Sequence, residues 1–198
     1  MKIAGARLRE RVIVAGIADW ARILPTLHRA TPAGAGFGSS RYSSPSNAFR
    51  VLYAADSFPT AFAEAVVRDR FEGKEKRYLY RPHLEQVCVT AISSSRELTM
   101  LDLRGGGAYE LGIDTDASRA RNHLSGQAFS EAVHAQMPDI DAILFDSRLT
   151  AGQRVAVYDR AFPALAGTPP IGVLQSALLP AELTRLKITL RRQRGYAR

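Results

Sequence analysis

The chain has 198 residues, of which 46% are hydrophobic and 23% charged, and this length suits one domain with a full core. No apolar run approaches the roughly 18 residues of a membrane helix, and Cys88 as the single cysteine excludes an internal disulfide. Lys and Arg outnumber Asp and Glu by 27 to 19, which favours anionic ligands or partners. We expect a cytoplasmic protein without membrane contact.

The N-terminal segment predicts a helix over residues 6–24. Leu8 and Val12 belong to an apolar set at helical spacing, and Pro25 ends the pattern because it removes a backbone donor. We therefore expect residues 1–25 to form a helical extension.

A strand, a loop, a second strand and a helix are predicted next. Residues 26–31 read as a short strand, and 32–47 as a loop, since this stretch holds three glycines, two prolines and five serines. Residues 51–55 read as a strand. Pro59 suits the first turn of a helix that continues over 60–71.

The rest of the chain continues to alternate between strands and helices. The apolar and β-branched patterns predict strands at 86–92, 98–103, 141–145 and 154–162, and helices at 117–136 and 180–192. No regular βαβ order appears. The pattern predicts an α+β fold, a single compact domain with a mixed, largely antiparallel sheet flanked by helices.

Three polar residues stand in three mostly apolar segments: Arg29 in TLHRATP, Glu64 in FPTAFAEAV and Ser147 in DAILFDSRL. An arginine, a carboxylate and a hydroxyl that converge suit a phosphate-bearing substrate whose reaction generates a cation. Each residue also has an ordinary reading. Arg29 suits an edge-strand salt bridge, Glu64 an i,i+4 ion pair with Arg68, and Ser147 a turn cap.

In this order the chain resembles the RES domain family, named for its Arg, Glu and Ser, over roughly residues 26–163. The most specific stretch is VLYAADSFPTAFAEAV, a strand ending in Tyr-x-Ala followed by a helix that presents Glu64. The glycine- and serine-rich loop ends in Arg41-Tyr42, where many relatives have Arg-Trp. The resemblance implies an ADP-ribosyltransferase-like fold with a catalytic domain at 26–165. Residues 166–198 would then form a C-terminal linker and a basic amphipathic helix packed on that domain.

The resemblance also implies an enzyme that consumes NAD. Glu64 would stabilise an oxocarbenium-like ribose, and Ser147 would bond the nicotinamide ribose or a phosphate. Arg29 would hold the pyrophosphate. These three are the expected catalytic residues. The expected NAD-binding residues are Arg41 on the pyrophosphate, and Tyr42 and Tyr53 stacked on nicotinamide or ribose.

The acceptor decides the reaction, and the sequence leaves it open. Water gives an NAD glycohydrolase, phosphate a phosphorylase, and a protein side chain an ADP-ribosyltransferase. NAD is expected as the substrate, with no further cofactor and no metal, because the four histidines and Cys88 lack metal-ligand spacing.

The resemblance implies a toxin neutralised by an Xre-type helix-turn-helix antitoxin, and it leaves a homo-oligomer open. The alternative from another class is a non-enzymatic module that binds nucleic acid or protein through the basic C-terminal helix in RLKITLRRQRGYAR. We do not expect direct nucleic-acid binding, since aromatic residues make up only 8% of the chain.

Overall fold

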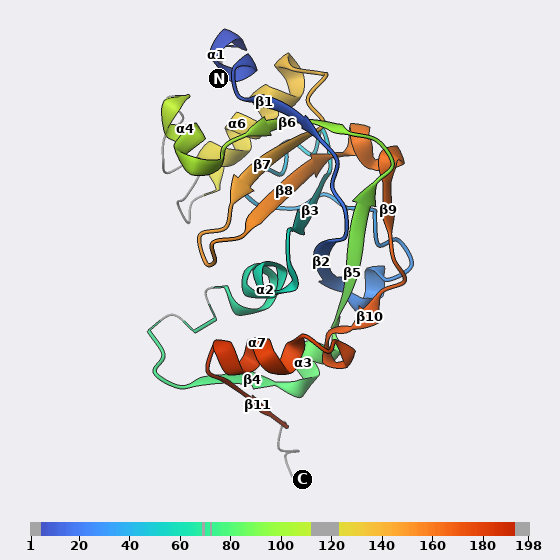
Figure 1. Cartoon of the computed structure of the whole chain (residues 1–198), viewed down its shortest axis with the longest axis vertical. Helices are drawn as coiled ribbons and strands as arrows, with labels where there is room; N and C mark the ends of the chain where they lie inside the picture. Colours follow the sequence, from blue (N-terminus) through green and yellow to red (C-terminus); the bar gives the residue numbers. More distant parts are fainter. Residues whose placement is uncertain (1–4, 69, 72, 112–122, 193–198) are drawn as a thin grey trace.

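A computed structural model describes residues 5–68, 70–71, 73–111 and 123–192 (Figure 1). Within them one large sheet comprises β1 (Val12–Ala15), β2 (Trp20–Pro25), β3 (Val51–Ala55), β5 (Val87–Ser94), β6 (Leu98–Asp102), β7 (Ala142–Asp146), β8 (Gln153–Tyr158), β9 (Leu165–Gly167) and β10 (Ile171–Gly172). Its order is β1-β6-β7-β8-β3-β2-β5-β10, with β9 also paired to β5. The pair β6–β7 is parallel, and the other pairs described in this sheet are antiparallel. The predicted mixed, largely antiparallel sheet is confirmed.

A two-stranded parallel sheet of β4 (Arg77–Tyr80) and β11 (Ile188–Arg191) lies apart from the large one. The α-helices are α1 (Gly5–Arg9), α2 (Phe58–Phe62), α3 (Arg81–Glu85), α4 (Gly107–Glu110), α6 (Leu124–Gln136) and α7 (Leu179–Arg185). The 3-10 turns are η1 (Thr26–His28), η3 (Arg104–Gly106), η4 (Asp159–Ala164) and η5 (Val173–Gln175), and η2 (Ala63–Val67) is a π-helix. Among the described helices none is long and apolar enough to cross a membrane.

The core divides into clusters because side chains alternate between the two faces of each strand. On one face, Phe129 and Val133 of α6 pack with Ile143 of β7 and Tyr158 of β8. On the other, Leu52, Leu144 and Val155 belong to a second cluster. A third cluster joins α2, α3 and α7 to the β4–β11 pair. Figure 1 shows α6 beside β6 and β7, with α2 near the centre of the molecule.

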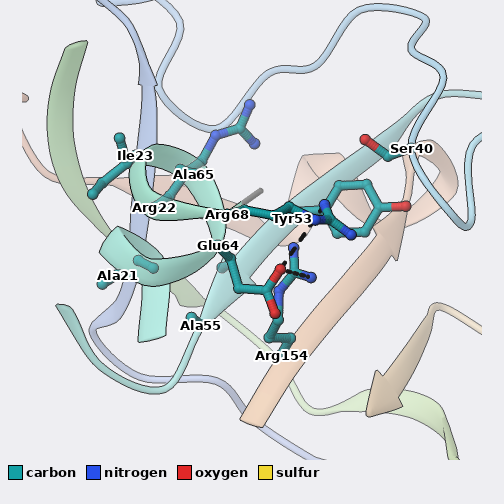
Figure 2. Close-up of a pocket in the computed structure, with 12 residues that line it drawn as sticks. Ala21, Arg22, Ile23, Ser40, Tyr53, Ala55, Glu64, Ala65, Arg68 and Arg154 are labelled. Atoms are coloured by element: carbon teal, nitrogen blue, oxygen red, sulfur yellow. Dashed lines mark hydrogen bonds and ion pairs between the residues drawn. The ribbon is translucent and has the colours of Figure 1, made fainter. Parts of the chain in front are cut away.

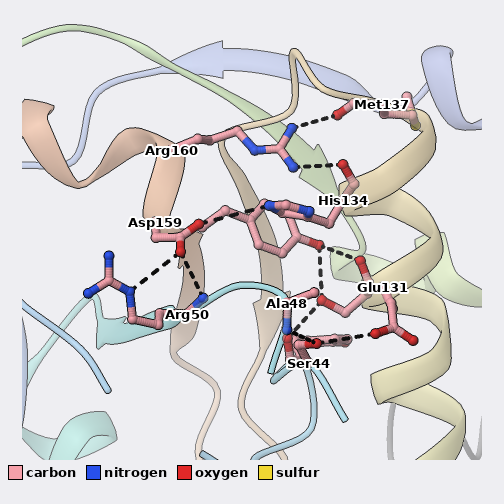
Figure 3. Close-up of polar contacts among 11 residues, drawn as sticks. Ser44, Ala48, Arg50, Glu131, His134, Met137, Asp159 and Arg160 are labelled. Carbon is pink, nitrogen blue, oxygen red and sulfur yellow. Dashed lines mark hydrogen bonds and ion pairs between the residues drawn. The ribbon is translucent and has the colours of Figure 1, made fainter. Parts of the chain in front are cut away.

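Polar contacts fix α6 to the end of β8 (Figure 3). Arg160 donates to the carbonyls of Met137 and His134, at 3.2 and 2.7 Å. Ser130 donates to the Tyr42 carbonyl at 2.7 Å and lies 3.0 Å from the Tyr158 hydroxyl. We call Ser130, His134, Tyr158, Asp159 and Arg160 the helix-anchor network.

The helix predicted over 6–24, and with it the helical extension at 1–25, is wrong. The described helix α1 ends at Arg9, and β1 and β2 enter the large sheet, β2 between β3 and β5. The chain turns between these strands at Asp19, which has a φ of 55°. Hydrogen bonds to the neighbouring strands stabilise this segment, and helical periodicity takes no account of them.

Two further expectations near the site are corrected. The strand predicted at 26–31 is the 3-10 turn η1, because β2 has already ended at Pro25. The helix predicted to begin with Pro59 in its first turn does so, from Phe58, but it does not continue to residue 71: its regular part gives way to the π-helix, which ends at Val67.

The C-terminal helix predicted at 180–192 is also wrong in its second half. Helix α7 ends at Arg185, Lys187 takes a φ of 54°, and β11 follows. The predicted linker after 165 contains β9 and β10. The strands predicted at 86–92, 98–103 and 141–145 are confirmed in substance as β5, β6 and β7. The strand predicted at 154–162 is confirmed only to Tyr158, where β8 ends and η4 begins. The helix predicted at 117–136 is seen from Leu124, its residues 117–122 lying outside the described part.

Candidate active site

A pocket opens where β2, β3 and β8 meet the α2–η2 segment, and its volume is about 190 Å³ (Figure 2). Its walls combine small apolar side chains with charged groups. The lining residues are Ala21, Arg22, Ile23, Ser40, Tyr53, Ala54, Ala55, Ala61, Glu64, Ala65, Arg68 and Arg154.

The π-helix η2 carries Glu64 into this pocket. Helix α2 begins with Ser57 as N-cap, whose hydroxyl accepts from the Thr60 amide, and with Pro59 in the first turn. After Phe62 the helix widens into η2, where Glu64 lies. Single π-turns inside α-helices recur at functional sites because they change the direction of a side chain.

The Glu64 carboxylate is held from two sides. Ser147 Oγ donates to Oε1 at 2.7 Å, and Arg154 Nη1 donates to Oε2 at 2.9 Å. Arg68 Nη1 lies 3.9 Å from Oε2. Only 6% of the Glu64 side chain is exposed, so its charge stays in one place, partly shielded from water.

Arg154 reaches Glu64 from β8 and lies among aromatic rings. Its guanidinium carbon is 5.4 Å from the ring centroid of Tyr53 and 5.2 Å from that of Phe145. Burial lowers the pKa of Arg154, and the charge of Glu64 opposes that effect. An arginine stays protonated under such conditions, so Arg154 supplies a fixed positive charge behind the carboxylate.

Arginines outnumber carboxylates around the pocket. Arg22, Arg68 and Arg154 line it together with Glu64. Arg41 is buried close by, and its pKa is lowered by burial and by the positive charges of nearby arginines that include Arg148. This surplus of positive charge favours an anionic ligand.

Arg22 is the lining arginine on β2. Its Nη2 donates to the Gly34 carbonyl at 2.8 Å, which ties the 32–47 loop to the sheet. Its Nη1 is buried and has no hydrogen-bond partner among the described residues. Burial lowers the pKa of Arg22 to about 10. A buried donor without a partner is costly, and a ligand anion would satisfy it.

Tyr53 lines the pocket, and the loop holds its ring in place. The Tyr42 amide donates to the Tyr53 hydroxyl at 2.8 Å. Burial raises the pKa of Tyr53 to about 12, so the phenol is neutral at physiological pH. Tyr42 itself is 1% exposed and packs edge-on against Phe145 in the core. It does not line the pocket, so the structure does not bring the Tyr42 ring together with Glu64 and Tyr53 as predicted.

The turn between β7 and β8 places Ser147 and Arg154 against Glu64. A Cβ on Gly152 would lie 2.0 Å from Thr60 Oγ1 and 2.8 Å from an Asp56 carboxylate oxygen, so the turn approaches α2 more closely than any other residue would allow. Asp56 also accepts from the Gln153 amide at 2.7 Å.

The structure brings part of the predicted set together. Glu64 and Tyr53 line the pocket. Ser147 is not among the lining residues, but it donates a hydrogen bond to Glu64. Arg29 is exposed at the end of η1 and is not among the lining residues, so its predicted place in this cleft is wrong. The reason is the early end of β2, which leaves Arg29 beyond the sheet.

Sequence reasoning missed Arg22, Arg68 and Arg154 as lining residues. Arg22 in WARILP and Arg154 in QRVAVY also stand in mostly apolar segments, as Arg29 does in TLHRATP. Arg68 was considered only as a surface partner of Glu64. Among the described residues no group of three or more His, Cys, Asp and Glu side chains could hold a metal ion.

The chain is similar to a known protein family. The model of the RES domain family matches residues 18–181. A probable toxin, y4kH of Sinorhizobium fredii, is 35% identical over 82 residues, which are 41% of this chain and 65% of that protein. The match thus spans less than two thirds of this relative.

A solved structure shares the fold. A chain in the crystal structure of the M. tuberculosis MbcT–MbcA toxin–antitoxin complex has a TM-score of 0.59 and 16% identity. The similarity covers 85% of this chain and 90% of that one. It supports the α+β fold class predicted from the sequence.

Proposed function

Because the chain belongs to the RES domain family, we propose that it is an NAD-consuming toxin that cleaves the bond between nicotinamide and ribose. The observation that carries the proposal is the shielded carboxylate of Glu64 among a surplus of arginines in one pocket. NAD offers the matching charges, since its pyrophosphate is anionic and its nicotinamide ribose becomes cationic during cleavage.

Cleavage of the nicotinamide–ribose bond requires stabilising negative charge at one place only, beside the ribose. When the glycosidic bond breaks, its electron pair leaves with nicotinamide and the ribose acquires oxocarbenium character. Glu64, fixed by Ser147 and Arg154, is positioned to stabilise that charge. Its oxygens keep lone pairs that can accept ribose hydroxyls. Ser147 thus acts by holding Glu64.

The pyrophosphate fits the arginine side of the pocket. Arg22, with its unpartnered Nη1, and Arg68 are the residues we assign to it. Tyr53 provides an aromatic wall for nicotinamide or ribose. A volume of about 190 Å³ is below the roughly 300–1,000 Å³ of whole-ligand pockets, so we assign it the nicotinamide-ribose end.

The acceptor distinguishes the candidate reactions. We propose hydrolysis or phosphorolysis first, because a pocket of this size excludes a protein side chain more readily than it excludes water or phosphate. Transfer of ADP-ribose to a protein side chain is the alternative. No metal enters this proposal, since the arginines supply the positive charge that phosphates need.

We also propose an antitoxin partner. The support is that y4kH is named a probable toxin and that the structural neighbour comes from a toxin–antitoxin complex. An antitoxin of the Xre helix-turn-helix type is the form that the family resemblance suggests.

Chromatography of NAD incubated with the purified protein tests this function. Free nicotinamide should appear with and without EDTA. ADP-ribose as second product identifies hydrolysis, a phosphorylated ADP-ribose phosphorolysis, and a mass gain on protein ADP-ribosylation. Unchanged NAD, with phosphate and acceptor proteins supplied, would overturn the proposal.

A further inference from the structure

The β4–β11 sheet joins two basic segments that lie far apart in the sequence. Residues 74–81 and 187–192 together contain seven Lys and Arg and one acidic residue. Their strands pair in parallel, with Tyr78 opposite Thr189 and Tyr80 opposite Arg191. Figure 1 shows this pair at the end of the molecule opposite α1.

One face of this small sheet is buried and the other is open. Leu79 and Ile188 are 0% and 7% exposed and belong to the core cluster of α2, α3 and α7. Because side chains alternate along a strand, Tyr78 and Tyr80 point to the opposite face. Tyr80 is 39% exposed, and the Arg191 guanidinium carbon lies 3.6 Å from the centroid of the Tyr78 ring.

The open face therefore combines rings with positive charge. Lys74, Lys76, Arg77, Lys187 and Arg192 are exposed in the same two segments. Arg77 donates to the carbonyl of Leu186, which ties β4 to the end of α7 just before β11. We call Tyr78, Tyr80, Arg191 and the exposed Lys74, Lys76, Lys187 and Arg192 the aromatic–basic face; Arg77 lies on the same side of β4 as Leu79 and is not part of it.

We propose that the aromatic–basic face binds single-stranded nucleic acid. Lysines and arginines contact the phosphates, and a base stacks on the exposed Tyr80 ring, an arrangement that proteins use to hold unpaired strands. A paired duplex hides its base faces, and an acidic peptide has no base to stack, so neither uses the rings. Direct nucleic-acid binding was not expected from an aromatic content of 8%, although Tyr78 and Tyr80 stand among basic residues in the segment 74–81.

This site is separate from the NAD pocket, since none of its residues lines that pocket. If the aromatic–basic face does not bind nucleic acid, the proposed NAD-consuming activity is unaffected. The test uses the full chain and fluorescence anisotropy with labelled oligouridylate and oligothymidylate about 12 nucleotides long, a length within the usual site size. A duplex of equal length and heparin serve as competitors.

Tyr80→Ala should weaken binding to the single strands about tenfold, and Tyr80→Phe should retain it. Lys76→Glu and Arg192→Glu should weaken binding and lower the slope of log affinity against log salt by roughly 0.7 for each lost phosphate contact. Arg7→Glu, an exposed charge reversal on α1, is the matched control and should bind as wild type. NAD turnover should stay at the wild-type rate in all five variants, which also shows that they are folded.

Three outcomes would overturn the proposal. The first is no binding at low salt. The second is equal loss in Arg7→Glu and Lys76→Glu, which would indicate attraction to net charge alone. The third is unchanged binding of Tyr80→Ala together with equal competition by duplex or heparin, which would make the face a general polyanion surface.

Discussion

Two partly buried clusters of this protein use arginine in opposite ways. In the helix-anchor network, Arg160 donates to two carbonyls at the C-terminal end of α6, which the helix itself leaves without partners (Figure 3). In the pocket, Arg68 and Arg154 lie beside Glu64, the one carboxylate among the lining residues, while Arg22 lines the pocket with its guanidinium turned away from that carboxylate (Figure 2). In the first cluster, Arg160 finds its hydrogen-bond acceptors in the protein itself. The second has three arginines and one carboxylate among its lining residues, so its wall carries a surplus of positive charge. This surplus distinguishes the ligand site from the structural cluster.

Glu64→Gln should have the largest effect. The change keeps the shape and removes the charge that opposes the oxocarbenium, so turnover of NAD should fall on the order of 10²–10³-fold. Steady-state kinetics by nicotinamide release measures it. Glu131→Gln is the matched control, because Glu131 accepts from Ser44 at 3.2 Å beside the helix-anchor network. Comparable losses in both variants would remove the distinction between the clusters.

Arg22→Met should come next and should act on binding. The stem remains while the buried guanidinium, with its unpartnered Nη1, is lost. We expect KM for NAD to rise roughly 30-fold with little change in kcat, because a charge-assisted bond to phosphate is missing in both ground and transition states. Arg29→Met provides the comparison, since Arg29 is exposed outside the pocket. If Arg29→Met raises KM and Arg22→Met does not, the original sequence prediction is right.

Ser147→Ala should have a smaller effect on the same chemistry. The hydroxyl donates to Glu64 and accepts from the amides of Leu149 and Thr150, at 3.1 and 3.2 Å. Its loss releases one side of the carboxylate, and kcat should fall about tenfold. A loss as large as that of Glu64→Gln would indicate that Ser147 takes part in the reaction directly.

Arg160→Met should leave turnover per folded molecule unchanged and lower stability instead. Two carbonyls of α6 lose their donor, which costs about 2 kcal/mol of unfolding free energy. Urea denaturation followed by circular dichroism measures the change. Normal stability with impaired turnover would contradict the structural role of the helix-anchor network.

The sequence predicted the centre of the fold better than its ends. Strand β3 matches its predicted bounds, 51–55, because a short apolar run is followed by a clear N-cap and proline. Residues 12–25 were misassigned as helix since their short apolar runs fit both periods, and only pairing with β3, β5 and β6 decides between them. Pairing of distant segments likewise makes β11 a strand.

The sequence predicted the types of residue in the candidate site but not all of their positions. Glu64 and Tyr53 were identified because a continuous strand–helix motif carries them. The predicted strand at 26–31 contains Arg29, whereas Arg22 falls within the predicted helix at 6–24 and in the structure lies on β2. Arg154 and Glu64 are 90 residues apart in the sequence, and no local sequence pattern predicts a contact over that separation.

A crystal structure of the Glu64→Gln protein with NAD tests the central claim most directly, because the variant should bind the substrate and turn it over slowly. The nicotinamide ribose should lie beside residue 64 and Tyr53, and the pyrophosphate should contact Arg22. NAD bound elsewhere on the molecule, with this pocket empty at saturating concentration, would contradict the assignment of the active site.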